Sequence, residues 1–153
     1  MNRKAFLDMI AFSEIGPDLL KKSDNGYNVI VGSTARNPNL FYSYKDHPRQ
    51  LVKLGPGLLS TAAGRYQLLA RYFDIYKNLL HLPDFSPSSQ DAIAIQQIHE
   101  CRALDDVDNG NFNEAVRKVS RIWASLPGAG YGQHENELAA LQSAYVAAGG
   151  TLA

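Results

Sequence analysis

Residues 3–17 read RKAFLDMIAFSEIGP, and their apolar side chains repeat with the period of a helix. Phe6, Ile10 and Glu14 are spaced four residues apart, so the Glu14 carboxylate lies in line with the apolar face. Pro17 cannot continue a helix, and the glycine before it is a good terminator. The stretch therefore predicts an amphipathic helix that ends close to Glu14.

Glu14 is an unusual occupant of that position. A helix C-terminus carries partial negative charge, and burial beside apolar side chains also disfavours an ionised carboxylate. Both effects predict a raised pKa for Glu14, and a general acid needs a raised pKa to hold its proton near neutral pH. The alternative is a solvated helix-end glutamate, which this position by itself favours over catalysis.

The composition limits the kind of protein this is. At 153 residues the chain fits one globular domain, and 15 Lys and Arg balance 15 Asp and Glu. The zero net charge gives no electrostatic argument for binding nucleic acid or an anionic membrane. The single cysteine, Cys101, excludes internal disulfides and predicts a core position in a protein made in a reducing cytoplasm. Asp8 and Glu14 interrupt the only N-terminal apolar run, so we expect no membrane insertion.

The middle of the chain changes to the period of β-strands. Apolar side chains alternate in residues 26–37 and again in residues 40–44, which predicts a hairpin with a long connection. Pro48 closes this region. Residues 53–64, KLGPGLLSTAAG, are punctuated by glycine and proline and predict a loop.

Helical spacing returns in the remaining segments. The predicted helices are residues 66–80, a helix with Ser86 as N-cap and Pro87 as first residue, residues 112–126 and residues 138–148. Helices before and after a short strand cluster predict an α+β fold in a single domain, residues 1–153. Glycine-rich loops between the elements could border a cleft.

Other chemistry-bearing residues give weaker signals. Tyr131 lies in the glycine-rich segment PGAGYGQ, where a flexible backbone can present its ring to a ligand. The histidines show no paired spacing with one another or with the cysteine, so we predict no metal site. They are His47, His81, His99 and His134. No phosphate-binding glycine motif and no GxSxG nucleophile motif occurs.

Six segments, in one order along nearly the whole chain, resemble a known family. They are RKAFLDMIAFSE, GYNVIVG, DHPRQLV, STAAGRYQLL, DFSPSSQDAIAIQQI and IWASLPGAGYGQ. Together they are similar to the phage lambda lysozyme (endolysin) family of peptidoglycan lytic transglycosylases, within the goose-lysozyme-like superfamily. The resemblance implies a lysozyme-like α+β fold, with a mainly helical body, a small antiparallel β-sheet and a substrate cleft between them.

The resemblance also implies an activity and a catalytic residue. Glu14 in AFSE matches the family's single catalytic glutamate. The family cleaves the β-1,4 bond between N-acetylmuramic acid and N-acetylglucosamine without water and leaves a 1,6-anhydro sugar. Glu14 is then expected to protonate the glycosidic oxygen and afterwards to accept the proton of the C6 hydroxyl. Phe12 stands where the lambda protein has tryptophan, and residues 33–45 form a longer segment than in that protein.

Further site residues are carried over by position. Gln67 matches the family's motif glutamine and is expected to bind or orient the sugar, because an amide both donates and accepts hydrogen bonds. Tyr131 is expected to contact substrate from the opposite lip of the cleft. Ser60 and Thr61 begin the glutamine's motif and are either cleft residues or local turn formers. The two lips correspond to residues 46–60 and 125–136.

The resemblance implies partners and alternatives as well. Peptidoglycan glycan strands are the expected substrate of a monomer that needs no cofactor or metal. The resemblance implies that the protein is located in the host cytoplasm. Its release to the periplasmic peptidoglycan is expected to depend on a holin, with which it forms no stable complex. The alternatives are a hydrolytic lysozyme and a non-catalytic cell-wall-binding module. The hydrolytic mechanism needs a second carboxylate, for which Asp18, Asp24 and Asp46 stay unassigned.

Overall fold

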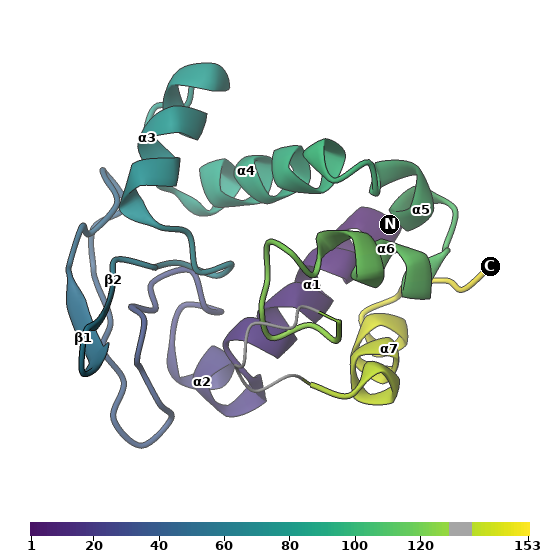
Figure 1. Cartoon of the computed structure of the whole chain (residues 1–153), viewed down its shortest axis with the longest axis horizontal. Helices are drawn as coiled ribbons and strands as arrows, with labels where there is room; N and C mark the ends of the chain where they lie inside the picture. The colour runs from purple at the N-terminus through teal and green to yellow at the C-terminus, as the bar shows by residue number, and fades with distance from the viewer. Residues whose placement is uncertain (129–135) are drawn as a thin grey trace. The chain divides into compact units, whose positions relative to one another are not determined.

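The computed structural model describes residues 1–128 and 136–153. The chain divides into two compact units: the terminal unit, residues 1–14 and 94–153, and the middle unit, residues 15–93. The described residues form seven helices and one small antiparallel sheet (Figure 1), which confirms the predicted lysozyme-like α+β fold.

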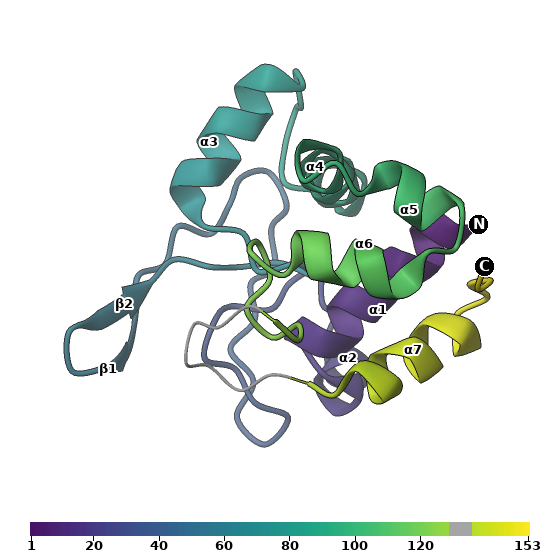
Figure 2. The ribbon, with the colours of Figure 1, turned by 45° about the vertical axis from the view of Figure 1, so that its right-hand side comes forward.

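The terminal unit is built from helices. They are α1 (Asn2–Glu14), α5 (Leu104–Asp108), α6 (Phe112–Val119), α7 (Leu138–Ala147) and the second half of α4 (Pro87–Glu100). Helix α1 lies beside α7, as both views show (Figures 1 and 2), and also contacts α5. The predicted first helix is thus confirmed, and it ends at Glu14.

Aromatic rings form part of the terminal unit's core. The ring of Phe6 meets Phe112 and Tyr145 edge to face, with ring centroids 6.1 and 6.4 Å apart. Trp123 and Leu126 are also buried, as the predicted stripe required, whereas Ile122 is 38% exposed. Helix α6 ends at Val119, several residues before the predicted end, but the apolar positions beyond it still reach the core.

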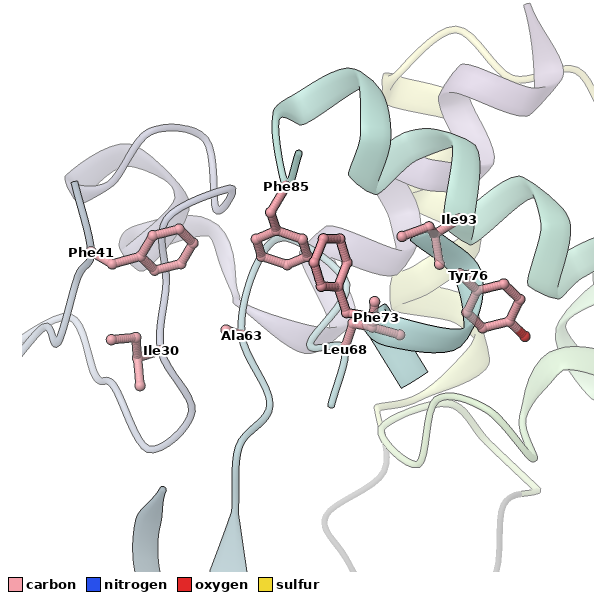
Figure 3. Close-up of a cluster of buried hydrophobic side chains, with 8 residues drawn as sticks. All are labelled: Ile30, Phe41, Ala63, Leu68, Phe73, Tyr76, Phe85 and Ile93. Atoms are coloured by element: carbon pink, nitrogen blue, oxygen red, sulfur yellow. The ribbon is translucent and has the colours of Figure 1, made fainter. Parts of the chain in front are cut away.

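The middle unit packs shorter elements around a separate apolar cluster. Its elements are α2 (Pro17–Lys22), β1 (Val52–Gly55), β2 (Leu58–Ser60), α3 (Ala70–Leu79) and the first half of α4. Figure 3 shows the cluster, in which Phe73 and Phe85 meet at a centroid distance of 5.0 Å and Phe41 stacks on Phe85 at 6.0 Å. The cluster therefore joins α3 to the long segment before β1 and to the start of α4.

The predicted strand positions were wrong. The only two paired strands in the described residues are β1 and β2. Except for the first residue of β1, both lie in residues 53–64, the segment that was predicted to be a loop. Residues 26–44 instead form single antiparallel bridges, Val29 with Leu40 and Ile30 with Ala63. The expected alternation fails at residues 28–30, because these three consecutive residues are all buried.

The start of one further helix also differs from the prediction. Helix α4 begins at Pro87 as predicted, but α3 begins at Ala70 and not at residue 66. Gln67 has a φ of +53°, a left-handed conformation that no α-helix continues through. The short helices α2 and α5 were not predicted, because six and five residues are too few to show a period.

Candidate active site

Glu14 is the last residue of α1 and is partly buried in the terminal unit. Burial raises the pKa of its carboxyl group, and hydrogen bonds from Ser125 oppose that shift. The predicted direction of the pKa is therefore confirmed, and burial is its main cause. No charged side chain among the described residues is a cause of this shift.

Three polar side chains form a hydrogen-bonded chain that ends on Glu14. The hydroxyl of Ser125 donates to Glu14 Oε2, and the hydroxyl oxygens of Ser13 and Ser125 are 2.7 Å apart. Asn136 Nδ2 donates to Ser13 Oγ at 3.0 Å and to the Ser13 carbonyl at 3.2 Å. Neither Ser125 nor Asn136 was predicted as an individual site residue, since each is far from Glu14 in sequence and carries no motif of its own.

Gln67 lies in the middle unit, on the turn between Ala63 and Leu68, which bridge each other. Its side-chain nitrogen donates to the carbonyls of Gly64 at 2.8 Å and Val29 at 3.3 Å. Both amide hydrogens are thus used within the protein. In the described residues the other amide atom, Oε1, has no hydrogen-bond donor, so it remains able to accept one from a ligand.

A buried polar network lies behind this turn. Asp91 Oδ1 accepts hydrogen bonds from the hydroxyls of Tyr66 at 2.6 Å and Tyr27 at 2.9 Å. The guanidinium group of Arg65 lies over both rings, 5.2 Å from the Tyr27 centroid and 5.6 Å from that of Tyr66. Burial and the Asp91 charge both raise the pKa of Tyr27. The network therefore favours neutral tyrosines that hold Asp91 and Arg65 in place.

The remaining sequence-predicted residues have mixed outcomes. Ser60 Oγ accepts the backbone N–H of Ala62 at 3.1 Å, and Thr61 Oγ1 accepts that of Ala70 at 3.0 Å, at the start of α3. Both hydroxyls thus stabilise the local backbone conformation through hydrogen bonds. Tyr131 lies outside the described residues. Glu14 belongs to the terminal unit, whereas Gln67, Ser60 and Thr61 belong to the middle unit.

Two of the unassigned carboxylates have partners in the middle unit. Asp46 forms an ion pair with Arg49, with Oδ2 and Nε 2.8 Å apart. Asp24 accepts the hydroxyl of Tyr44 at 2.6 Å. Within the described residues no three His, Cys, Asp or Glu side chains gather into a group able to hold a metal.

Cys101 is buried, as predicted. Over residues 1–128 and 136–153, no helix has both the length and the apolar character needed to span a bilayer.

Known proteins resemble this chain over almost its whole length. An endolysin family model matches residues 4–152. The endolysin of Escherichia phage lambda is 54% identical over 151 residues, covering 98% of this chain and 92% of that protein. The endolysin of Escherichia phage P2 is 46% identical over 154 residues, covering 97% and 93%.

Solved structures agree with the sequence comparisons. Bacteriophage lambda lysozyme in complex with a chitohexasaccharide superposes with a TM-score of 0.91 at 52% identity, covering 99% of this chain and 96% of that one. Another structure of lysozyme from bacteriophage lambda gives a TM-score of 0.87 at the same identity and coverage. The chain therefore belongs to the endolysin family.

Proposed function

We propose that this phage endolysin is a peptidoglycan lytic transglycosylase in which Glu14 serves first as acid and then as base. The bond cleaved is the β-1,4 linkage between N-acetylmuramic acid and N-acetylglucosamine, and the product is a 1,6-anhydromuramic sugar. The observation that carries the proposal is the partly buried position of Glu14 at the end of α1, where desolvation raises its pKa. A solved relative that holds a chitohexasaccharide supports a glycan substrate.

The acid step uses the protonated form of Glu14, which burial favours. The carboxyl group donates this proton to the glycosidic oxygen as the C1–O bond breaks, and the bond's electron pair stays with that oxygen. Departure of a neutral hydroxyl leaves positive charge at C1, beside a newly formed Glu14 carboxylate. The Ser125 hydroxyl bound to Oε2 favours that carboxylate.

The base step returns the proton to the same residue. The C6 hydroxyl of the muramic sugar attacks C1, and Glu14 accepts its proton, so the enzyme ends in its starting state. Because the nucleophile belongs to the substrate, the reaction gains the proximity of an intramolecular step and requires no second carboxylate to activate water.

Substrate binding is proposed for four residues outside α1. Gln67 would accept a hydrogen bond at Oε1 from a sugar hydroxyl or an acetamido N–H, since its side-chain nitrogen already donates to two backbone carbonyls. The hydroxyl oxygens of Ser60 and Thr61 accept hydrogen bonds from backbone N–H groups, so their hydroxyl hydrogens could be donated to a sugar oxygen. We also propose that Tyr131 contacts the glycan with its ring.

Analysis of the sugar ends after digestion of purified peptidoglycan tests the proposal. We expect 1,6-anhydromuramic termini; new reducing termini would establish hydrolysis, and no released fragments would leave a binding module. Glu14→Gln keeps the shape of the side chain but cannot cycle a proton, so we expect wall binding without turnover. The matched control is Glu114→Gln, which alters an exposed ion pair with Arg117 and is expected to retain activity.

We further propose that both units act as one catalytic domain, in a monomer without cofactor. The protein would accumulate in the host cytoplasm and reach the periplasmic peptidoglycan once a holin permeabilises the membrane. Expression in a host without a holin is expected to leave cells intact until the membrane is opened chemically. Prompt lysis without that treatment would contradict holin dependence but not the cleavage chemistry.

A further inference from the structure

The hydrogen-bonded chain that ends on Glu14 has a direction, and the direction follows from its first member. Asn136 Nδ2 contacts the carbonyl oxygen of Ser13 at 3.2 Å, and a carbonyl can only accept a hydrogen bond. The atom facing Ser13 is therefore the amide nitrogen and not the amide oxygen. The same nitrogen lies 3.0 Å from Ser13 Oγ, so the Ser13 hydroxyl is an acceptor at this contact.

The Ser13 hydroxyl must then place its own hydrogen elsewhere. Its one other hydrogen-bond partner among the described residues is Ser125 Oγ, 2.7 Å away. Ser13 therefore donates to Ser125. The remaining hydrogen, that of Ser125, is directed at Glu14 Oε2. All three links run the same way, from Asn136 through Ser13 and Ser125 to the carboxyl group.

We propose that this chain gives the two oxygens of Glu14 separate tasks, with Oε2 as a fixed hydrogen-bond acceptor and Oε1 as the only oxygen that carries the reacting proton. This inference rests on the proposed acid and base function of Glu14. Ser13, Ser125 and Asn136 are positioning residues, because they act through Glu14 and touch no reacting atom.

The assignment of the acid proton to Oε1 follows because the contact between Ser125 Oγ and Glu14 Oε2 holds only one hydrogen. If the acid proton were on Oε2, it would meet the Ser125 hydrogen, and one of the two would lose its acceptor. Reversing the chain would then require Ser13 to give its hydrogen to a partner other than Ser125. The described residues offer none. The proton is thus kept on Oε1, to which no side chain of the described residues donates a hydrogen bond, and this oxygen is left for the glycan.

The same chain defines both forms of the acid. In the protonated form, Oε1–H donates to the glycosidic oxygen while Oε2 keeps its bond to Ser125. In the carboxylate form, the Ser125 bond becomes a charge-assisted one and strengthens. When Oε1 takes the proton of the C6 hydroxyl, the original arrangement returns without any rotation of the carboxyl group. The carboxyl plane therefore keeps one orientation through the cycle.

Ser125→Ala tests the last link of the chain. Loss of a hydrogen bond to a carboxylate raises the pKa of Glu14, so the alkaline limb of kcat/KM is expected to move upward by about one pH unit. We expect kcat to fall about tenfold, because the carboxylate formed after proton donation loses its donor. Ser125→Thr restores the hydroxyl and is expected to recover most of both changes. A lower kcat with an unmoved alkaline limb would overturn the proposal, because it would indicate a merely structural role.

Ser13→Ala tests the relay itself without adding a charge or removing the Ser125 bond. Because hydrogen bonds in a chain strengthen one another, the alkaline limb is expected to move in the same direction by a few tenths of a pH unit. An unmoved limb would overturn the relay. Ser120→Ala is the matched control, since this buried serine in the same unit donates to the Arg117 carbonyl and is expected to leave the pH profile unchanged.

A titration that needs no turnover separates this proposal from the proposed function. Carbon NMR of glutamate carboxyl groups follows the Glu14 pKa directly, with Glu14→Gln identifying the resonance. We expect that pKa to be higher in Ser125→Ala than in the wild type, and an equal value would overturn the proposal. Normal turnover by Glu14→Gln would instead reject the acid and base function, whatever the titration gives.

Discussion

Gln90 holds Arg65 in place from α4, because Gln90 Oε1 accepts a hydrogen bond from the Arg65 backbone N–H at 2.9 Å. The nitrogen of the same amide donates to the carbonyls of Tyr27 and Phe85, both at 3.0 Å. Gln90 is 4% exposed, so water does not compete for these bonds. One side chain thus joins three segments and fixes the turn that presents Gln67.

Gly64, within this turn, is expected to tolerate no side chain. Its φ is +88°, and a β-carbon there would lie 2.4 Å from Gln90 Oε1 and 2.9 Å from the Phe85 ring. Gly64→Ala should lower the free energy of unfolding by about 3 kcal/mol or more, because left-handed strain and overpacking add. Urea unfolding measures the loss.

Gly57 provides the control for that substitution. Its φ is also positive, at +69°, but nothing lies within 4 Å of a β-carbon placed there. Gly57→Ala should therefore cost only the conformational strain, about 1 kcal/mol. Equal losses for the two variants would show that the contact with Gln90 contributes nothing.

Gln67→Glu is expected to be worse than Gln67→Ala. The glutamate would turn carboxylate oxygens toward the carbonyls of Gly64 and Val29, which the native nitrogen satisfies. We expect Gln67→Ala to weaken glycan binding or slow turnover and Gln67→Glu to lower the melting temperature as well. Kinetics on peptidoglycan and calorimetry distinguish the two effects. Unchanged kinetics in Gln67→Ala would make Gln67 a structural residue only.

Asp91→Asn should change the titration of Tyr27. The Asp91 charge helps to raise the pKa of this tyrosine, so its removal should shift the tyrosinate absorbance to lower pH. Because the folded pKa lies above the unfolded value, the associated stability is complete below about pH 10 and is lost as the pH rises. The variant should also unfold more easily at neutral pH, by about 1–3 kcal/mol. Tyr27→Phe identifies the titrating group.

His47 is expected to make the stability pH-dependent on the acid side. Its Nε2 lies 2.8 Å from the Leu68 carbonyl and its Nδ1 accepts the Arg49 backbone N–H at 2.9 Å, which together require the neutral ring. Burial lowers the pKa of His47, with the charges of Arg49, Asp46 and Asp74 nearby. The stability is thus present above about pH 6.5 and is lost as the pH falls, by at most about 1.4 kcal/mol per pH unit.

Unfolding in urea at several pH values between 5 and 8 checks this dependence. His47→Gln should flatten the acid side of the stability profile, since the amide does not titrate. His99→Gln changes an exposed histidine on α4 and should leave the profile as in the wild type. If the His47 variant keeps the wild-type slope, another group causes the acid dependence.

Local sequence patterns predicted the elements whose signals are local. Helix α1 and the first residue of α4 were correct, because their period, glycine and proline positions act within one or two turns. The start of α3 was placed too early, because the left-handed Gln67 depends on hydrogen bonds to Gly64 and Val29. The paired strands were missed, because glycine and proline also suit the tight turn of a short hairpin.

For the candidate site, the sequence alone located Glu14 at a helix end beside apolar residues and predicted that its pKa is raised. Six co-linear segments also carry the resemblance to the family. Only the tertiary structure brought Ser125 to Glu14 across 111 residues and Asn136 to Ser13 across 123. Hydrogen bonds between such distant residues leave no period or spacing in a sequence, because folding alone decides which polar groups meet.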